Sequence, residues 1–112
     1  MEWQIGITEE YESWFLGLSE PEQIDVRAAV ELLKLLGPDL KRPYADSVKG
    51  ARRLKNLKEL RIQHRGKPYR VFFAFGSDRR AILLCGGRKD GRRAKQFYSS
   101  MVSLAEKAFS NM

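Results

Sequence analysis

Three consecutive segments in the second half of the sequence have the pattern of strands joined by tight turns. Residues 57–64 alternate apolar and polar side chains, residues 69–75 are apolar on both faces except at Arg70, and residues 81–85 are apolar throughout. The two connections are rich in turn residues: Arg65-Gly66-Lys67-Pro68 and Gly76-Ser77-Asp78. A strand that is apolar on both faces is typical of the middle of a sheet, so residues 69–75 are predicted to form a central strand.

The first part of the chain predicts a short strand followed by two helices. Residues 3–7 alternate in the manner of a strand, and Thr8 is placed to cap a helix whose first turn is acidic. Ser19 and Glu22 have the spacing of a capping box at the start of a second helix, which Gly37-Pro38 ends. The expected apolar faces are Tyr11, Trp14, Phe15 and Leu18 in the first helix, and Ile24, Ala28, Leu32, Leu35 and Leu36 in the second.

The remaining segments are a connection and a last helix. Residues 38–53 contain two prolines and a glycine, which favours an irregular connection. From about Arg92 to Asn111 a third helix is expected, with its core side formed by Phe97, Met101, Leu104, Ala105 and Ala108. The predicted order is β-α-α-β-β-β-α, an α+β fold with two N-terminal helices packed on a small, mainly antiparallel sheet and a C-terminal helix. No repeat or long linker divides the sequence, so residues 1–112 are expected to form one domain.

Charge is distributed unevenly along the chain. The sequence contains 21 lysines and arginines against 14 acidic residues, a net charge of +7. Residues 1–40 carry nine acids and two bases, whereas residues 41–112 carry five acids and nineteen bases. This segregation favours a polyanionic partner for the second half, above all nucleic acid, with a basic surface that binds nothing as the competing interpretation.

Several classes of site are excluded by composition. One cysteine, Cys85, and one histidine, His64, allow no internal disulfide, no Cys/His zinc site and no two-histidine ribonuclease mechanism. Cys85 is expected to be a core thiol and His64 a strand-end side chain near the turn. No apolar run approaches the roughly 20 residues of a membrane span, and the start, Met1-Glu2-Trp3, lacks a positive leader. We therefore expect a cytosolic protein without a cofactor.

Basic side chains on the predicted sheet are the candidates for a functional site. Arg61 lies on the polar face of the first sheet strand, and Arg70 follows nine residues later across the turn. Antiparallel pairing brings these positions close to register, so both arginines are expected on one solvent-facing side. Lys89 and Arg88 leave the end of the neighbouring strand toward the same edge, and Tyr98 lies one turn into the last helix.

Such a group could bind RNA or cleave it. Cleavage requires that a 2′-hydroxyl attack the adjacent phosphorus, that charge on the phosphoryl oxygens be stabilised, and that the leaving 5′-oxygen be protonated. Arginines supply the stabilisation, but a lysine or tyrosine would have to transfer the protons, with a pKa lowered by the neighbouring cations. From the residues alone, binding is favoured over cleavage, and the arginines could also simply pair with Glu59.

Three stretches carry a resemblance to a known family. They are residues 56–61 (NLKELR), 66–73 (GKPYRVFF) and 82–89 (ILLCGGRK). Together they resemble the RelE/HigB superfamily of type II toxins, especially its phage-derived, HigB-like branch. The specific part is Leu-x-Glu-Leu-Arg followed by Gly-x-x-Tyr-Arg, and the predicted element order, size and basic charge also suit that family.

The resemblance implies a RelE-like fold and a ribosome-dependent mRNA endoribonuclease that cleaves without metal and is inhibited by a cognate antitoxin, commonly a helix-turn-helix protein. The arginines at 61 and 70, a basic residue at 89 or 88, and the tyrosine at 98 match the catalytic positions of the family. In this hypothesis Arg61 and Arg70 neutralise the phosphate, Lys89 supports them, and Tyr98 transfers protons or stacks on a base. The basic residues expected to contact RNA around them are Arg52, Arg53, Lys55, Lys58 and Arg88.

The sequence departs from the family at the general base. Leu57 and Glu59 occupy positions where RelE-type members have alternating lysines, so Glu59, Lys55 or Lys58 would have to substitute, or other residues would transfer the protons. The acidic helices are expected on the side away from RNA, with the antitoxin covering the basic groove.

Two rival functions remain open at this point. One is a ParE-like toxin that shares the fold and binds a topoisomerase, and the other is a phage-derived protein that binds nucleic acid without cleaving it. The nuclease hypothesis depends on Arg61 and Arg70 crowding around one RNA linkage. Arginines splayed to opposite sides of the sheet, or tied up in internal ion pairs, would remove the nuclease assignment and leave only a basic domain.

Overall fold

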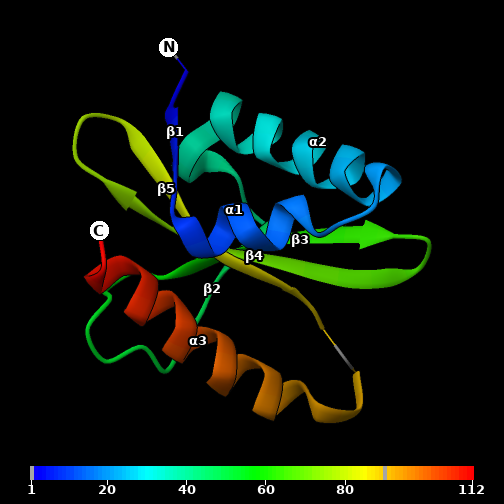
Figure 1. Ribbon diagram of the computed structural model, residues 1–112. Helices are drawn as coiled ribbons and strands as arrows, with labels where there is room; N and C mark the ends of the chain where they lie inside the picture. Colours follow the sequence, from blue (N-terminus) through cyan, green and yellow to red (C-terminus); the bar gives the residue numbers. More distant parts are fainter. Residues whose placement is uncertain (1, 90) are drawn as a thin grey trace.

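The computed structural model describes residues 2–89 and 91–112 (Figure 1). Its strands are β1 (Gln4–Ile7), β2 (Ala45–Ser47), β3 (Lys58–His64), β4 (Lys67–Gly76) and β5 (Arg80–Arg88). Its α-helices are α1 (Glu9–Leu16), α2 (Glu20–Leu36) and α3 (Ala94–Ser110), and short 3-10 turns lie at Gly37–Asp39 and Gly91–Arg93. The order matches the prediction except for β2, which lies within the connection expected to be irregular.

The five strands form one mixed sheet in the order β1-β5-β4-β3-β2. β1 pairs with β5 in parallel, and all other neighbours are antiparallel. β4 is therefore the central strand, as its apolar pattern predicted. The predicted α+β architecture is confirmed, and it is consistent with the RelE-like fold.

Helices cover both faces of this sheet. In Figure 1, α1 and α2 lie on one side of the strands and α3 on the other. Alternation along β4 divides the core accordingly, because Val71 and Phe73 pack with the buried residues of α1 and α2, whereas Phe72 and Ala74 pack with those of α3. A side chain on β3 or β4 that is not directed at α1 and α2 therefore points toward α3.

The rotation of α2 differs from the sequence prediction. Ile24 and Leu35 were expected in the core but are 56% and 60% exposed, whereas Val26 and Leu33 are fully buried. Both sets have helical spacing, and the sheet selects the second set because those side chains meet the surface of β3 and β4. The predicted face of α1 is confirmed, since Tyr11 is buried and its apolar neighbours pack around it.

Most of the predicted core face of α3 is also confirmed. Met101, Ala105 and Ala108 are buried, but Leu104 is exposed and Val102 takes a core position instead. β5 runs three residues beyond its predicted end, through Gly86 and Gly87, so the strand reaches the register positions opposite Val71 and Arg70. A Cβ on Gly86 would overlap the ring of Trp14 from α1, which explains the glycine at this close approach.

Candidate active site

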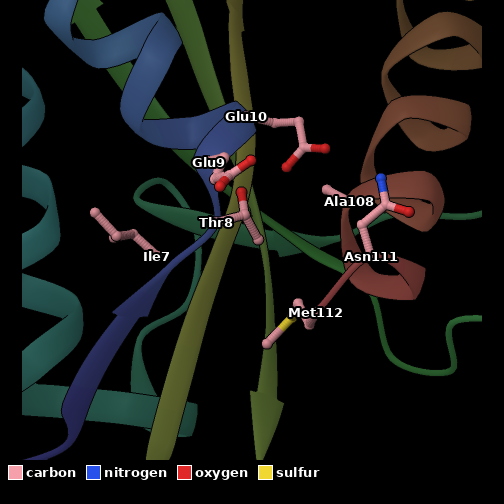
Figure 2. Close-up of a pocket in the computed structure, with 7 residues that line it drawn as sticks. All are labelled: Ile7, Thr8, Glu9, Glu10, Ala108, Asn111 and Met112. Atoms are coloured by element: carbon pink, nitrogen blue, oxygen red, sulfur yellow. The ribbon is translucent and has the colours of Figure 1, made fainter.

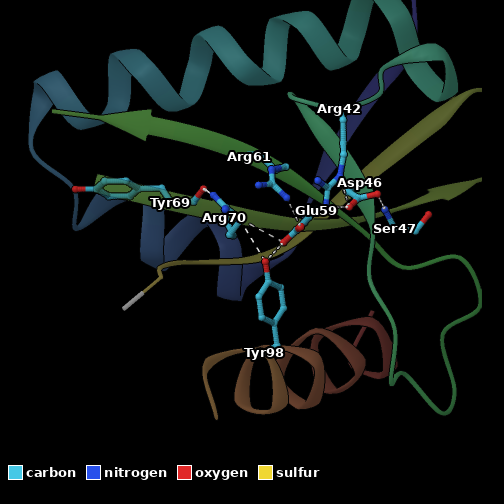
Figure 3. A network of polar contacts seen from close by, with 8 residues as sticks. All are labelled: Arg42, Asp46, Ser47, Glu59, Arg61, Tyr69, Arg70 and Tyr98. Carbon is cyan, nitrogen blue, oxygen red and sulfur yellow. Dashed lines mark hydrogen bonds and ion pairs between the residues drawn. The ribbon is translucent and has the colours of Figure 1, made fainter. Parts of the chain in front are cut away.

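The register of β3 and β4 places the two candidate arginines directly opposite each other. Arg61 pairs with Arg70, and Glu59 pairs with Phe72, whose side chain packs toward α3. Glu59, Arg61 and Arg70 therefore lie on the α3 side of the sheet, where Tyr98 approaches from the helix (Figure 3). The prediction that the two arginines share one face is confirmed.

Glu59 lies at the centre of this group. The hydroxyl of Tyr98 donates a hydrogen bond of 2.6 Å to Glu59 Oε1, and Arg70 Nε lies 3.5 Å from the same oxygen. Arg61 Nη1 lies 3.6 Å from Glu59 Oε2. A buried carboxylate is stable only when it is paired and hydrogen-bonded, and these three side chains satisfy that requirement. We call Glu59, Arg61, Arg70 and Tyr98 the Glu59 cluster.

Burial separates the two arginines. Arg70 and Glu59 are each only 3% exposed, whereas the side chain of Arg61 is 28% exposed. The expectation that Arg70 faces solvent is wrong, because α3 covers this side of β4 and Tyr98 closes over the guanidinium group. Arg70 donates to the carbonyl oxygen of Tyr69 at 3.0 Å and contacts Glu59, so in this structure its guanidinium group is held beside the carboxylate.

The protonation of Tyr98 also differs from the expectation. Burial is the largest cause that raises the pKa of Tyr98 above its ordinary value, and its hydrogen bond to Glu59 raises the pKa further against the opposing effect of Arg70. Proton transfer by Tyr98 was expected to need a pKa lowered by the neighbouring cations. The structure instead keeps Tyr98 a neutral phenol near pH 7 that donates its proton toward a carboxylate.

Of the two basic residues at the end of β5, Lys89 lies beside the Glu59 cluster and Arg88 does not. Its backbone N–H donates to the carbonyl oxygen of Pro68 at 2.8 Å, and its Nζ lies 5.7 Å from the centre of the Tyr98 ring. Arg88 is paired with Tyr69 in the ladder and lies beside the Tyr69 hydroxyl, which itself donates to Glu22 of α2. Arg88 is therefore directed to the opposite side of the sheet.

A second ion pair continues the row of charges toward the sheet edge. Asp46 of β2 is the register partner of Glu59, and Arg42 Nε and Nη2 each lie 2.8 Å from its carboxylate (Figure 3). The hydrogen bond from Arg42 is the main reason that the pKa of Asp46 lies below its ordinary value. Sequence reasoning did not find Asp46 or Arg42, since it placed no strand at 45–47 and so could not align Asp46 with Glu59.

The other predicted RNA contacts lie at different places. Arg52, Arg53 and Lys55 are exposed in the segment between β2 and β3, and Arg52 and Arg53 lie close to α3. Lys58 is half-buried and paired with Phe73, which places it on the α1 and α2 side of β3. The structure thus assembles Arg61, Arg70, Lys89 and Tyr98 with Glu59. It places Arg52 and Arg53 against α3 and directs Lys58 and Arg88 to the other side of the sheet.

The lone histidine and cysteine are distant from this chemistry. His64 Nδ1 lies 2.6 Å from the Asp25 carboxylate on the α2 side, so it tethers β3 to α2. Burial raises the pKa of the Cys85 thiol to about 12, which makes it a core residue rather than a nucleophile, as predicted. Among the described residues, no three His, Cys, Asp or Glu side chains are grouped closely enough to hold a metal ion.

A separate pocket of about 350 Å³ lies where β1 enters α1, beside the end of α3 (Figure 2). Glu9 and Glu10 line it, which makes it unfavourable for a polyanion. Within residues 2–89 and 91–112, no helix is long and apolar enough to cross a membrane.

Comparison with known proteins identifies the family. The family described as phage derived protein Gp49-like (DUF891) matches residues 13–110. The chain is 38% identical over 100 residues to the protein named "Putative toxin HigB3" of Mycobacterium tuberculosis (strain ATCC 25618 / H37Rv). The matched region covers 89% of this chain and 84% of that relative. The chain is 39% identical over 109 residues to "Putative toxin HigB2" of the same strain, covering 94% of this chain and 53% of that relative, so it spans about half the length of HigB2. No solved structure matches the chain significantly. Because the family match covers most of the sequence, the chain belongs to the phage-derived Gp49-like family, as its resemblance to the HigB-like branch predicted.

Proposed function

We propose that this protein is the toxin of a type II toxin-antitoxin pair and that it cleaves ribosome-bound mRNA without a metal ion. The similarity to two proteins named as HigB toxins supports the first part. The observation that carries the second part is the Glu59 cluster, in which a carboxylate, a neutral phenol and two guanidinium groups meet beside Lys89.

In this proposal Glu59, one of the three substitutes that the sequence left open, is the final proton acceptor. Tyr98 is a neutral phenol, so its oxygen can take the proton of an RNA 2′-hydroxyl only as its own proton passes to Glu59 across the 2.6 Å hydrogen bond. The freed 2′-oxygen then forms a bond to the adjacent phosphorus, and the bond from phosphorus to the 5′-oxygen breaks. The products are a 2′,3′-cyclic phosphate and a 5′-hydroxyl, and the proton balance requires one further donor for the leaving oxygen.

Lys89 and Arg61 complete the reaction. Arg61 is the more exposed arginine of the cluster and donates to the phosphoryl oxygens as negative charge accumulates there. Lys89 carries an ammonium group beside the Tyr98 ring, where it can protonate the leaving 5′-oxygen. Arg70 is a positioning residue in this scheme, because its contact with Glu59 holds the carboxylate beneath the Tyr98 hydroxyl.

One observation favours a second candidate, RNA binding without cleavage. Both arginines are paired with Glu59, and Arg70 and Glu59 are buried, so the guanidinium groups are not free as the nuclease hypothesis first required. The nuclease remains the better supported function, because the carboxylate that pairs with the arginines can also act as the base. Glu59 would then take the role of the lysine that related toxins have at this position. Retained RNA binding without any cleavage is the outcome that would favour this alternative.

Mapping of transcript 5′ ends after induction of the protein tests the proposal. We expect cuts in translated regions, in register with codons, from the native chain, and loss of these cuts from Glu59→Gln and Tyr98→Phe, which keep the shape of each side chain. Lys67→Ala, at an exposed position on β4 outside the cluster, is the control and should cut normally. A DNA-damage response without cuts would instead identify a topoisomerase inhibitor, and normal cutting by folded Glu59→Gln would remove Glu59 from the mechanism.

A further inference from the structure

A groove of about 640 Å³ runs along α3 beside the Glu59 cluster. One wall comes from Lys49 and Arg52, in the segment between β2 and β3, and the other from α3, including Lys95 and Tyr98. The volume lies within the range of ordinary ligand sites, roughly 300–1,000 Å³, and is suited to about one or two nucleotides.

The groove is basic because its cations come from two separate parts of the chain. Lys49, Arg52 and Lys95 are all exposed, and no carboxylate of the described residues forms an ion pair with any of them. Ser99 and Ser103 lie four residues apart on α3 and add two hydroxyl groups to the same wall. Ammonium, guanidinium and hydroxyl groups in one groove are the donors that contact phosphate oxygens and ribose.

Glu106, the acid in the groove lining, reduces the positive charge of the groove without cancelling it, because three cations line the groove beside this single carboxylate. Glu106 accepts hydrogen bonds from the backbone N–H groups of Arg53 and Leu54, the second at 3.1 Å. These bonds, with that of Arg53 the largest cause, lower the pKa of Glu106. Glu106 therefore fixes the segment that carries Lys49 and Arg52 against α3.

Tyr98 connects the groove to the cluster. Its ring lines the groove, while its hydroxyl donates to Glu59 and its ring faces Lys89. A chain of nucleotides that lies in the groove would therefore bring one of its phosphates to the Glu59 cluster. A linear ligand with regularly spaced negative charges fits this arrangement better than a compact anion does.

We infer that this groove binds the sugar–phosphate backbone of single-stranded RNA next to the linkage that is cleaved, with Lys49, Arg52 and Lys95 contacting phosphates. The inference rests on the proposed function, since it assigns the groove to the same substrate. It extends that function, because it names Lys49 and Lys95 as phosphate contacts and Glu106 as the residue that positions the opposite wall.

The test measures binding separately from cleavage. A short fluorescent 2′-O-methyl RNA, which cannot undergo 2′-hydroxyl attack, is titrated with protein at several salt concentrations. Each phosphate contact to a single strand contributes about 0.7 to the slope of log affinity against log salt. Lys49→Ala/Lys95→Ala should bind more weakly and lower the slope by about 1.4, whereas the matched control Lys41→Ala/Lys67→Ala, at exposed sites outside the groove, should leave it unchanged.

The outcomes distinguish this inference from the proposed function. An unchanged slope in Lys49→Ala/Lys95→Ala, or an equal loss in the control pair, overturns the inference even if the native chain cleaves RNA. Tighter binding of an RNA duplex than of the single strand also overturns it. A slope reduced only in the groove variant, in a native chain that makes no cuts in mRNA, supports the groove as an RNA site and refutes the nuclease.

Discussion

Replacing Arg70 with alanine should destabilise the fold, although Arg70 lies on a polar strand face. The substitution leaves Glu59 buried with only the Tyr98 hydrogen bond and a 3.6 Å contact to Arg61. Removing one partner of a buried ion pair costs about 3–5 kcal/mol of stability. Because Glu59 keeps two partners, we expect a loss of about 3 kcal/mol for Arg70→Ala. For a domain of this size that loss lowers the melting temperature by roughly 12 °C.

Urea or thermal unfolding of four proteins measures this effect. The single variants are Arg70→Ala and Glu59→Gln, and the double variant combines them, so that the coupling between the two side chains is obtained directly. The double variant should be more stable than Arg70→Ala alone because it no longer buries an unpaired charge. Arg61→Ala, which removes a partly exposed partner, should cost about 1 kcal/mol or less.

A free energy of unfolding of Arg70→Ala within about 0.5 kcal/mol of the native value, typical of surface positions, would refute this reasoning. The result also decides how functional variants are interpreted. If Arg70→Ala unfolds the domain, its loss of toxicity says nothing about catalysis, and Tyr98→Phe, which leaves the ion pair between Arg70 and Glu59 in place, must carry that test.

Three further predictions follow from individual contacts. Gly86→Ala should lose about 1–3 kcal/mol because its Cβ would overlap the Trp14 ring, whereas Gly91→Ala, with open space around the Cβ, should melt like the native chain. The hydrogen bond from Tyr69 is the largest cause that lowers the pKa of Glu22 from 4.5 to about 2. The stabilisation of the fold by ionised Glu22 is therefore complete above pH 4.5 and is lost as the pH falls toward 2. A Glu22→Gln variant should show a flatter dependence of stability on pH in this range, and an unchanged dependence would contradict the assignment. Cys85, with its pKa near 12, should resist thiol reagents in the folded protein at about pH 8 and react once denaturant is added, as mass spectrometry would show.

The sequence contains the information for the sheet register but not for what covers it. Alternation and turn length were enough to place Arg61 opposite Arg70 and to make β4 central. The same alternation predicts that Arg70 lies on a polar face of the sheet. Arg70 is buried only because α3 packs over that face. A residue predicted to face solvent is thus buried without any change in strand pattern.

Other differences have the same origin in tertiary contacts. β2 has three residues and follows a proline, so no local signal marks it, and it exists through its pairing with β3. α2 carries two apolar stripes of similar spacing, and contact with the sheet decides between Val26 and Ile24. Local periodicity identifies the element in such cases, whereas its neighbours determine its edges and its rotation.

The charge segregation along the chain becomes a segregation in space. The acidic residues of α2 lie on one side of the sheet, and the Glu59 cluster, Lys89 and the groove along α3 lie on the other, while Glu9 and Glu10 of α1 line the separate pocket at the C-terminal end of α3. A polyanion is therefore repelled from one face and attracted to the face where Tyr98 and Glu59 meet. The buried Glu59 does not reverse this field, because Arg61 and Arg70 neutralise it locally and the exposed lysines and arginines of the groove remain in excess. If RNA binds this face as proposed, its association rate should be high at low ionic strength and fall steeply as salt is added, whereas the proposed proton transfer over the short distance between Tyr98 and Glu59 should be much less sensitive to salt.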